Sequence, residues 1–162
     1  MTYSKVTVYP EKCTGCRACE MVCSLNKWGE CSPERAAIRN IRTEEAGLVS
    51  TLPVLCQQCE TPICQAVCPV GAITRAELTG AVVVDVDKCL GCRRCVYSCP
   101  FGGVSVDSVT GKAFKCELCG GDPNCAKFCS KEALKFVKDD KISANRKRES
   151  SEKYREFLKG QG

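Results

Sequence analysis

The sequence predicts an α+β fold made of two related small lobes, each with short β-hairpins and short helices. Three observations support this prediction. Sixteen of the 17 cysteines fall into four groups of four. Only 6% of the 162 residues are aromatic, which leaves little material for an ordinary apolar core. Short β-branched runs and turn residues recur around the cysteine groups. Together these features indicate a fold that bound metal organises.

The predicted strands lie at matching positions in the two lobes. β-Branched runs precede the first and third cysteine groups, at residues 5–9 and 81–86. A Pro-x-Gly segment follows the second and third groups, and the apolar residues after it, Ile73 and Val104, are expected to begin further strands. The repetition of this pattern indicates an internal duplication.

Turns and helices complete each predicted lobe. The pairs Thr79-Gly80 and Thr110-Gly111 are expected to close hairpins. One helical turn is expected between the third and fourth cysteine of every group. These four segments are residues 20–22, 65–67, 96–98 and 126–128.

The cysteine spacing predicts ligands for iron–sulfur clusters. The groups are Cys13, Cys16, Cys19 and Cys23; Cys56, Cys59, Cys64 and Cys68; Cys89, Cys92, Cys95 and Cys99; and Cys116, Cys119, Cys125 and Cys129. The first and third groups read C-x2-C-x2-C-x3-C, and the other two lengthen only the middle gap. A tight turn can aim the first three thiolates at one cubane. The fourth cysteine then lies beyond that cubane and points toward a neighbouring cluster. The four groups therefore have the capacity for four [4Fe-4S] clusters.

Disulfides, zinc binding and metal storage are alternative roles for so many cysteines. Disulfides suit small secreted proteins, but the sequence begins Met1-Thr2-Tyr3-Ser4-Lys5 without an apolar signal segment, and 17 is an odd number. Zinc is the stronger rival because paired C-x2-C motifs often hold it, although three thiolates in seven residues fit one tetrahedron poorly. A metal-storage protein would have little core, whereas 44% of this chain is hydrophobic. Metal analysis separates zinc from iron.

Charge and hydropathy limit the possible partners. The formal net charge is +5, but sixteen thiolates and four oxidised clusters add about −8. The net charge of the chain with its clusters is therefore expected to be about −3. Nucleic acid is not an expected partner, because clustered Lys and Arg with interleaved aromatics are absent outside the tail. No stretch approaches the roughly 20 apolar residues of a membrane helix. So many free thiolates indicate a reducing cytoplasm.

The cysteine groups carry a resemblance to a known family. Residues 5–137 resemble the four-cluster ferredoxin-type electron-transfer subunits of the dimethyl sulfoxide reductase and formate dehydrogenase class, with all four groups in that family's order. Residues 13–24 and 29–33 are similar to the short subunits that accompany tungsten enzymes of the aldehyde:ferredoxin oxidoreductase type, which include the benzoyl-CoA reductase of strict anaerobes. The resemblance implies duplicated bacterial-ferredoxin-like lobes with two [4Fe-4S] clusters each.

The resemblance also implies that groups exchange their fourth ligands. The implied sets are Cys13, Cys16, Cys19 and Cys129 for cluster 1; Cys56, Cys59, Cys64 and Cys99 for cluster 2; Cys68, Cys89, Cys92 and Cys95 for cluster 3; and Cys23, Cys116, Cys119 and Cys125 for cluster 4. Spacing supports the exchange independently only for the two central groups, which both end in Cys-Pro.

The expected domain organisation follows the pairing of the groups. A four-cluster domain spans residues 1–137, with an inner lobe at about residues 53–111 and an outer lobe formed by residues 1–52 and 112–137. Residues 138–162 form a charged C-terminal arm. The only large apolar residues of its segment 145–159 share one face of a helix, so docking on a partner and a solvated tail stand as equal alternatives. These residues are Tyr154, Phe157 and Leu158.

Single residues outside the groups carry smaller expectations. Cys31 is expected to be an ordinary packed thiol, and Trp28 a packing or interface residue. The cations near the cysteines are expected to be solvated surface charges rather than residues that raise reduction potentials. They are Lys12, Arg17, Lys88, Arg93, Arg94 and Lys115.

The expected function is electron transfer without catalysis, because a cubane with four cysteine ligands has no open coordination site. The resemblance implies a noncatalytic subunit of an anaerobic oxidoreductase. A large partner would carry a tungsten or molybdenum pterin, and a further protein would donate or accept electrons. The alternatives are a freestanding polyferredoxin and an electron-transfer partner of a hydrogenase or carbon monoxide dehydrogenase. Copurification with a large metalloenzyme favours the noncatalytic subunit, and a stable 17.6 kDa monomer favours the polyferredoxin.

Overall fold

The computed structural model of the chain describes residues 4–138 and Ser151. The expectations for the C-terminal arm, including the shared helical face of Tyr154, Phe157 and Leu158, lie outside these residues.

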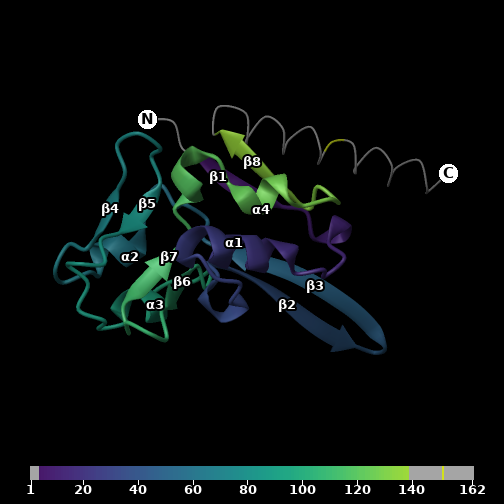
Figure 1. Cartoon of the computed structure of the whole chain (residues 1–162), viewed down its shortest axis with the longest axis horizontal. Coiled ribbons are helices and arrows are strands. Elements are labelled where there is room, and N and C mark those ends of the chain that lie inside the picture. Colours follow the sequence, from purple (N-terminus) through teal and green to yellow (C-terminus); the bar gives the residue numbers. More distant parts are fainter. Residues whose placement is uncertain (1–3, 139–150, 152–162) are drawn as a thin grey trace.

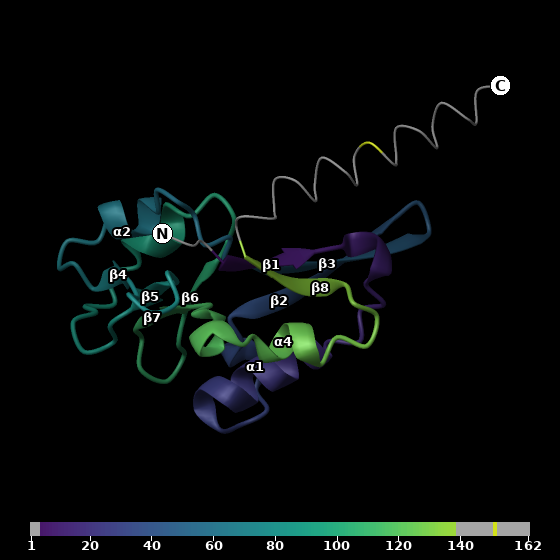
Figure 2. The same ribbon diagram turned by 90° about the horizontal axis from the view of Figure 1, so that it is seen from above.

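Four small antiparallel sheets form the framework of the described chain, each with two strands. The pairs are β1 (Ser4–Val8) with β8 (Leu134–Lys138), β2 (Ile38–Glu45) with β3 (Leu48–Leu55), β4 (Ile73–Arg75) with β5 (Val82–Val84), and β6 (Val104–Val106) with β7 (Ala113–Lys115). The predicted strands and the two predicted hairpins are confirmed. Strands β1 and β8 come from opposite ends of the described chain and lie side by side (Figures 1 and 2).

Four α-helices of the described residues overlap the four predicted helical turns, and each begins just before the third cysteine of its group. They are α1 (Ala18–Trp28), α2 (Ile63–Ala66), α3 (Arg94–Tyr97) and α4 (Asn124–Lys127). Three 3-10 turns, Pro10–Lys12, Pro33–Arg35 and Leu118–Gly121, complete the elements. Helix α1 extends beyond the predicted single turn to 11 residues and ends at Gly29, which adopts the left-handed conformation common after a helix.

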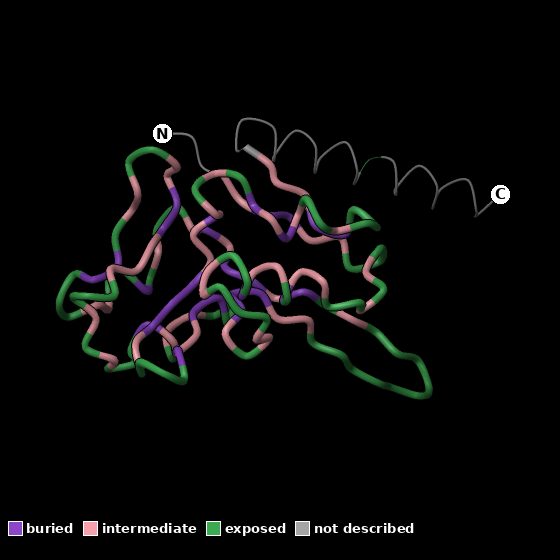
Figure 3. Tube along the Cα trace, in the orientation of Figure 1, coloured by how far each residue is buried: buried purple, intermediate pink, exposed green. Residues whose placement is uncertain are grey.

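The elements gather into two regions (Figures 1 and 2). One contains α2, α3 and the hairpins β4–β5 and β6–β7, and the other contains α1, α4, the β1–β8 pair and the long β2–β3 hairpin. The sequence did not predict that hairpin. Its outer part, residues 41–50, is exposed throughout (Figure 3). The expected lobe boundary at residue 53 lies inside β3.

The core is divided into two small clusters that include cysteines. One holds Val6, Ile38, Leu55, Ala81, Leu118, Cys125 and Leu134, and the other holds Cys64, Ile73, Val82, Cys95, Val104 and Ala113. Because proposed ligands form part of both cores, packing and metal binding are coupled in this fold.

A clamp of four side chains joins α1 and the following turn to the β6–β7 hairpin. The Trp28 ring meets Phe114 edge to face, with centroids 5.6 Å apart. The Arg35 guanidinium lies over Trp28 and donates from Nε to Asp107 at 2.7 Å. Asp107 is 1% exposed, and this ion pair and the Thr110 side chain hold its pKa at about 2 against the opposing effect of burial. The clamp therefore links the two regions. It also confirms the packing role expected of Trp28.

Candidate metal centres

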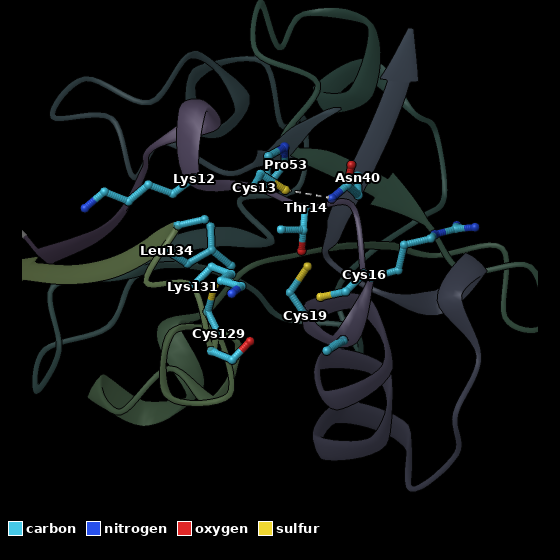
Figure 4. A pocket seen from close by; sticks show the side chains of 14 residues that line it. Lys12, Cys13, Thr14, Cys16, Cys19, Asn40, Pro53, Cys129, Lys131 and Leu134 are labelled. Atoms are coloured by element: carbon cyan, nitrogen blue, oxygen red, sulfur yellow. Dashed lines mark hydrogen bonds between the residues drawn. The ribbon is translucent and has the colours of Figure 1, made fainter. Parts of the chain in front are cut away.

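Cysteines from the two ends of the described chain line one cavity. Cys13, Cys16 and Cys19 approach it from the loop before α1 and from the start of α1, and Cys129 approaches from the segment after α4 (Figure 4). We call this place site 1. It brings together all four residues of the first implied ligand set.

Two residues of the β2–β3 hairpin hold Cys13 in site 1. The Asn40 side chain donates from Nδ2 to Cys13 Sγ at 3.2 Å, and the Thr51 hydroxyl donates to the Cys13 carbonyl at 3.2 Å. Burial raises the pKa of Cys13, but hydrogen bonds from Thr51, the Gly15 backbone and Asn40 outweigh it and lower that pKa overall. Hydrogen bonds therefore favour the thiolate that a metal requires.

A second cavity lies beside α1, and the whole of the fourth implied set lines it. We call it site 4; its cysteines are Cys23, Cys116, Cys119 and Cys125. The backbone N–H of Ala37 donates to Cys23 Sγ at 3.3 Å. Burial raises the pKa of Cys116 to about 12, because a charged thiolate is unfavourable away from solvent.

A third cavity lies in the other region, and the third implied set lines it. We call it site 3; its cysteines are Cys68, Cys89, Cys92 and Cys95. Backbone N–H groups of Ala72 and Ala113 donate to Cys68 Sγ and Cys89 Sγ at 3.3 and 3.4 Å. Burial raises the pKa of Cys68, but four backbone N–H groups outweigh it and lower that pKa overall.

Electrostatic interactions and a shared neighbour, Gly103, relate three of the four cysteines of the remaining set, site 2. The charges of Cys56 and Cys99 both act on the pKa of Cys64, which burial raises. The Gly103 backbone N–H donates to Cys99 Sγ at 3.3 Å, and a Cβ on Gly103 would lie 2.6 Å from the Cys56 Cα. The fourth cysteine, Cys59, accepts a hydrogen bond from the Arg75 guanidinium at its backbone carbonyl.

The cysteines of sites 1, 3 and 4 line common cavities in sets of four. Within the described part of the chain, no group of three cysteine, aspartate or glutamate side chains is arranged to hold a single metal ion.

The four sites follow one another in the order 1, 4, 2, 3. Sites 1 and 4 share α1, where Cys19 and Cys23 are one helical turn apart. Sites 4 and 2 lie close together, since the charge of Cys56 in site 2 raises the pKa of Cys116 in site 4. Sites 2 and 3 share α2 and α3, whose cysteines contribute to one packed core. The two exposed cysteines among the proposed ligands, Cys16 and Cys92, lie in the end sites 1 and 3.

Two protein-family models match the chain. A model described as a 4Fe-4S dicluster domain matches residues 47–139, more than half of the chain, and a 4Fe-4S binding domain matches residues 6–24. This protein belongs to the 4Fe-4S dicluster family. Its cysteines therefore bind several [4Fe-4S] clusters, which confirms the expectation of iron–sulfur chemistry.

Curated relatives cover most of the chain. It is 38% identical over 135 residues to the polyferredoxin-like subunit of an aliphatic sulfonate oxidoreductase from Pyrococcus furiosus, covering 82% of this chain and 76% of that protein. It is 36% identical to the thiosulfate reductase electron transfer subunit PhsB of Salmonella typhi, covering 96% and 87%. It is 34% identical to the B subunit of an anaerobic dimethyl sulfoxide reductase from Escherichia coli K12, covering 81% and 71%. These matches confirm the resemblance to ferredoxin-type oxidoreductase subunits.

Two expectations about single residues were wrong. Lys115 was expected at the surface, but it is 2% exposed, because β7 is buried along its whole length. Cys31 was expected to be packed, but it is exposed in the loop after α1. The other five cations near the cysteines are exposed, as expected.

Sequence reasoning missed the polar residues that support the sites. Asn40 and Thr51 act from the unpredicted hairpin. Glu20 is fully buried and accepts hydrogen bonds from Arg17 and from the Asn40 backbone, which ties α1 to β2. Gln58 is 5% exposed and accepts from the Val82 backbone. Only tertiary contacts assign these roles, so no motif in the sequence could have found them.

No helix among the described residues is both long enough and apolar enough to cross a membrane.

Proposed function

We propose that this chain transfers electrons through four [4Fe-4S] clusters as a noncatalytic subunit of an oxidoreductase complex whose catalytic centre lies on a partner. One observation carries the proposal: cysteines far apart in the sequence, such as Cys13 and Cys129, line common cavities in sets of four. The names of the relatives as oxidoreductase and electron-transfer subunits support the same function.

The proposed ligand sets are those of sites 1 to 4, with the fourth cysteine of each group donated to the neighbouring site. The lining of three cavities and the contacts of Cys56, Cys64 and Cys99 support this exchange. When bound, a cubane with four cysteine ligands exchanges one electron and offers no position for substrate. The chain itself supplies the thiolates, the N–H donors to sulfur and a shared core that fixes the spacing of the sites.

Duplication explains why the sites are alike. The residue before the second cysteine of each group has a positive φ in all four groups: Gly15, Gln58, Gly91 and Leu118. A second position three residues after the last cysteine repeats this conformation in three groups, at Gly71, Gly102 and Glu132. Equal backbone geometry at equal offsets supports two related lobes, the inner one at about residues 53–111.

Each end of the row is proposed to exchange electrons with a different protein, because sites 1 and 3 contain the exposed ligands Cys16 and Cys92. One is a large catalytic subunit with a tungsten or molybdenum pterin, a finer assignment supported by the resemblance of residues 13–24. The other is a separate electron donor or acceptor. We place the complex in the cytoplasm, where thiolates stay reduced. A freestanding polyferredoxin is the alternative.

Anaerobic purification from the native host tests the proposal. We expect about sixteen irons per chain, a paramagnetic signal after dithionite reduction, and a large metalloenzyme that copurifies. The Cys31→Ala variant is the control, because Cys31 lies outside the four sets and its loss should leave the iron content unchanged. A colourless protein that holds zinc would contradict cluster binding. A loaded chain that always migrates alone would favour the polyferredoxin.

Paired variants test the exchange of ligands. Cys129→Ala and Cys16→Ala should alter the same redox transition, since both residues line site 1. Cys125→Ala should alter a different transition, since Cys125 lines site 4. If Cys129→Ala and Cys125→Ala instead alter one common transition, each group holds its own cluster and the proposed exchange is wrong.

A further inference from the structure

A lysine lies buried at the middle of the row of sites. Lys115 is the last residue of β7, and its ammonium donates to the Val82 carbonyl at 2.5 Å. Only 2% of Lys115 is exposed. In the part of the chain that the structure describes, no ion pair joins this ammonium to a carboxylate. Lys115 therefore differs from Lys27, which lines the same cavity but pairs with Glu117, and from Lys12 and Lys88, which are exposed.

Lys115 lies between sites 4 and 2. It lines the site 4 cavity and directly precedes the ligand Cys116. Its charge also acts on Cys64 of site 2, where it opposes the rise in pKa that burial causes. One side chain thus reaches the surroundings of both middle sites.

A second buried side chain fixes this junction. Gln58 donates from Nε2 to the Cys116 carbonyl at 2.8 Å and accepts from the Val82 backbone N–H at 2.8 Å. Lys115 holds the carbonyl of the same Val82. The two side chains therefore bind opposite polar groups of one residue, which limits the movement of the Lys115 ammonium.

A nearby anion is needed to offset the hydration free energy that a buried cation loses. An ammonium without water loses several kcal/mol of hydration, and one carbonyl dipole offsets only part of that. Among the groups around Lys115, the thiolates of sites 2 and 4 are anionic when they hold metal. A cubane with four thiolates carries net negative charge, and reduction by one electron makes it more negative, so a cation between two such sites stabilises the reduced forms.

We propose that Lys115 is a positioning residue that acts as the shared counter-charge of the two middle sites and raises the reduction potentials of the clusters bound there. The inference rests on the proposed function, because it needs clusters in sites 2 and 4. Lys115 itself takes up no electron. Its fixed charge favours the state in which a middle cluster has gained one electron, supplied by dithionite in the test below.

The test is an anaerobic redox titration of the full chain, followed by electron paramagnetic resonance. In Lys115→Gln, two of the four transitions should move to lower potential, with the reduced-to-oxidised ratio at a fixed potential falling about tenfold, or about 59 mV. Lys115→Arg keeps the charge and should restore most of this loss. Lys88→Gln removes the same charge at an exposed position beside site 3 and should leave the two middle transitions in place.

The outcomes separate this inference from the proposed function. If the wild-type chain holds no iron, the proposed function fails. If the wild type is loaded and Lys115→Gln keeps its iron and all four potentials, only this inference fails. If Lys115→Gln and Lys115→Met lose iron from the middle sites while Lys115→Arg keeps it, the charge is required and the inference stands. Loss of iron in all three variants would assign Lys115 a packing role and overturn the inference.

Discussion

The end sites and the middle sites share a backbone but differ in the residues placed on it. At the residue before the second cysteine of each group, φ is 70° and 69° at Gly15 and Gly91, and 51° and 61° at Gln58 and Leu118. The first and third cysteine groups, which supply three cysteines each to the end sites 1 and 3, place glycine there, and glycine adopts this conformation freely. The middle groups place buried side chains there, although such residues at positive φ are strained by about 1 kcal/mol or more.

This difference indicates that the middle of the row is packed and the ends are open. Leu118 fills the first core cluster, and Gln58 joins sites 2 and 4. At the ends, the exposed cysteines Cys16 and Cys92 leave the loops accessible. A row that exchanges electrons with partners needs this arrangement, because its terminal sites must face other proteins while its interior excludes water.

Loss of one ligand should have the largest effect, and it should differ between middle and end. Cys125 is part of the first core cluster, so Cys125→Ala removes a site 4 ligand and opens the core around it. Cys92 is exposed, so Cys92→Ala should cost only site 3 and leave about twelve irons per chain. Iron analysis and thermal unfolding under anaerobic conditions measure both effects. Equal losses of iron and of thermal stability in the two variants would remove the distinction.

Local signals predicted much of this fold. Strands β1, β4, β5 and β6, both small hairpins and the four helical turns were found because β-branched runs, Thr-Gly turns and cysteine spacing act over a few residues. The β2–β3 hairpin was missed because β2 is rich in charged residues and its two-residue turn is Ala46-Gly47 rather than a strong Asn-Gly or Asp-Gly signal.

Tertiary contacts decide what the local pattern could not. Lys115 and Lys88 each lie immediately before a proposed ligand, yet one is buried between two sites and the other is exposed. The strand that carries Lys115 is covered on one side by Trp28, which lies more than 80 residues earlier in the chain. The residue type and its neighbours in sequence therefore do not reveal its environment.

The clamp at Asp107 should contribute the next largest effect, because it holds the middle of the molecule together. Asp107→Ala removes the buried partner of Arg35 and leaves it only the exposed Glu30, so it should destabilise the loaded protein by about 2 kcal/mol. Asp122→Ala breaks an exposed ion pair with Lys127 and should cost less than about 1 kcal/mol. Denaturant unfolding of both variants gives the comparison. Similar small costs would mean that the two regions do not depend on this clamp.

The two end loops should tolerate change unequally. Both Gly91→Ala and Gly15→Ala place a side chain at positive φ, at a cost of about 1 kcal/mol each. A Cβ on Gly91 would also lie 2.8 Å from the Gly111 carbonyl oxygen, which is backbone of the β6–β7 turn, whereas a Cβ on Gly15 would meet the Thr51 methyl group at 2.9 Å. Side chains move more easily than backbone. Gly91→Ala should therefore cost about 2 kcal/mol or more in thermal unfolding, and equal costs would contradict this account.

The smallest predicted effect concerns the sulfur hydrogen bonds, and it isolates site 1. Asn40 donates to a cysteine sulfur from its side chain, whereas donors at the other sites, such as Ala37 and Ala72, use backbone N–H groups that a substitution does not remove. Asn40→Ala should therefore lower the potential of the site 1 cluster alone, by about 40 mV if the bond contributes about 1 kcal/mol more in the reduced state. Thr43→Ala, at an exposed position on the same strand, is the matched control. Lys115 is proposed to act on the two middle sites and Asn40 on one end site. A redox titration measures the difference. If Asn40→Ala moved the middle transitions, the potentials of the sites would not depend independently on their own surroundings.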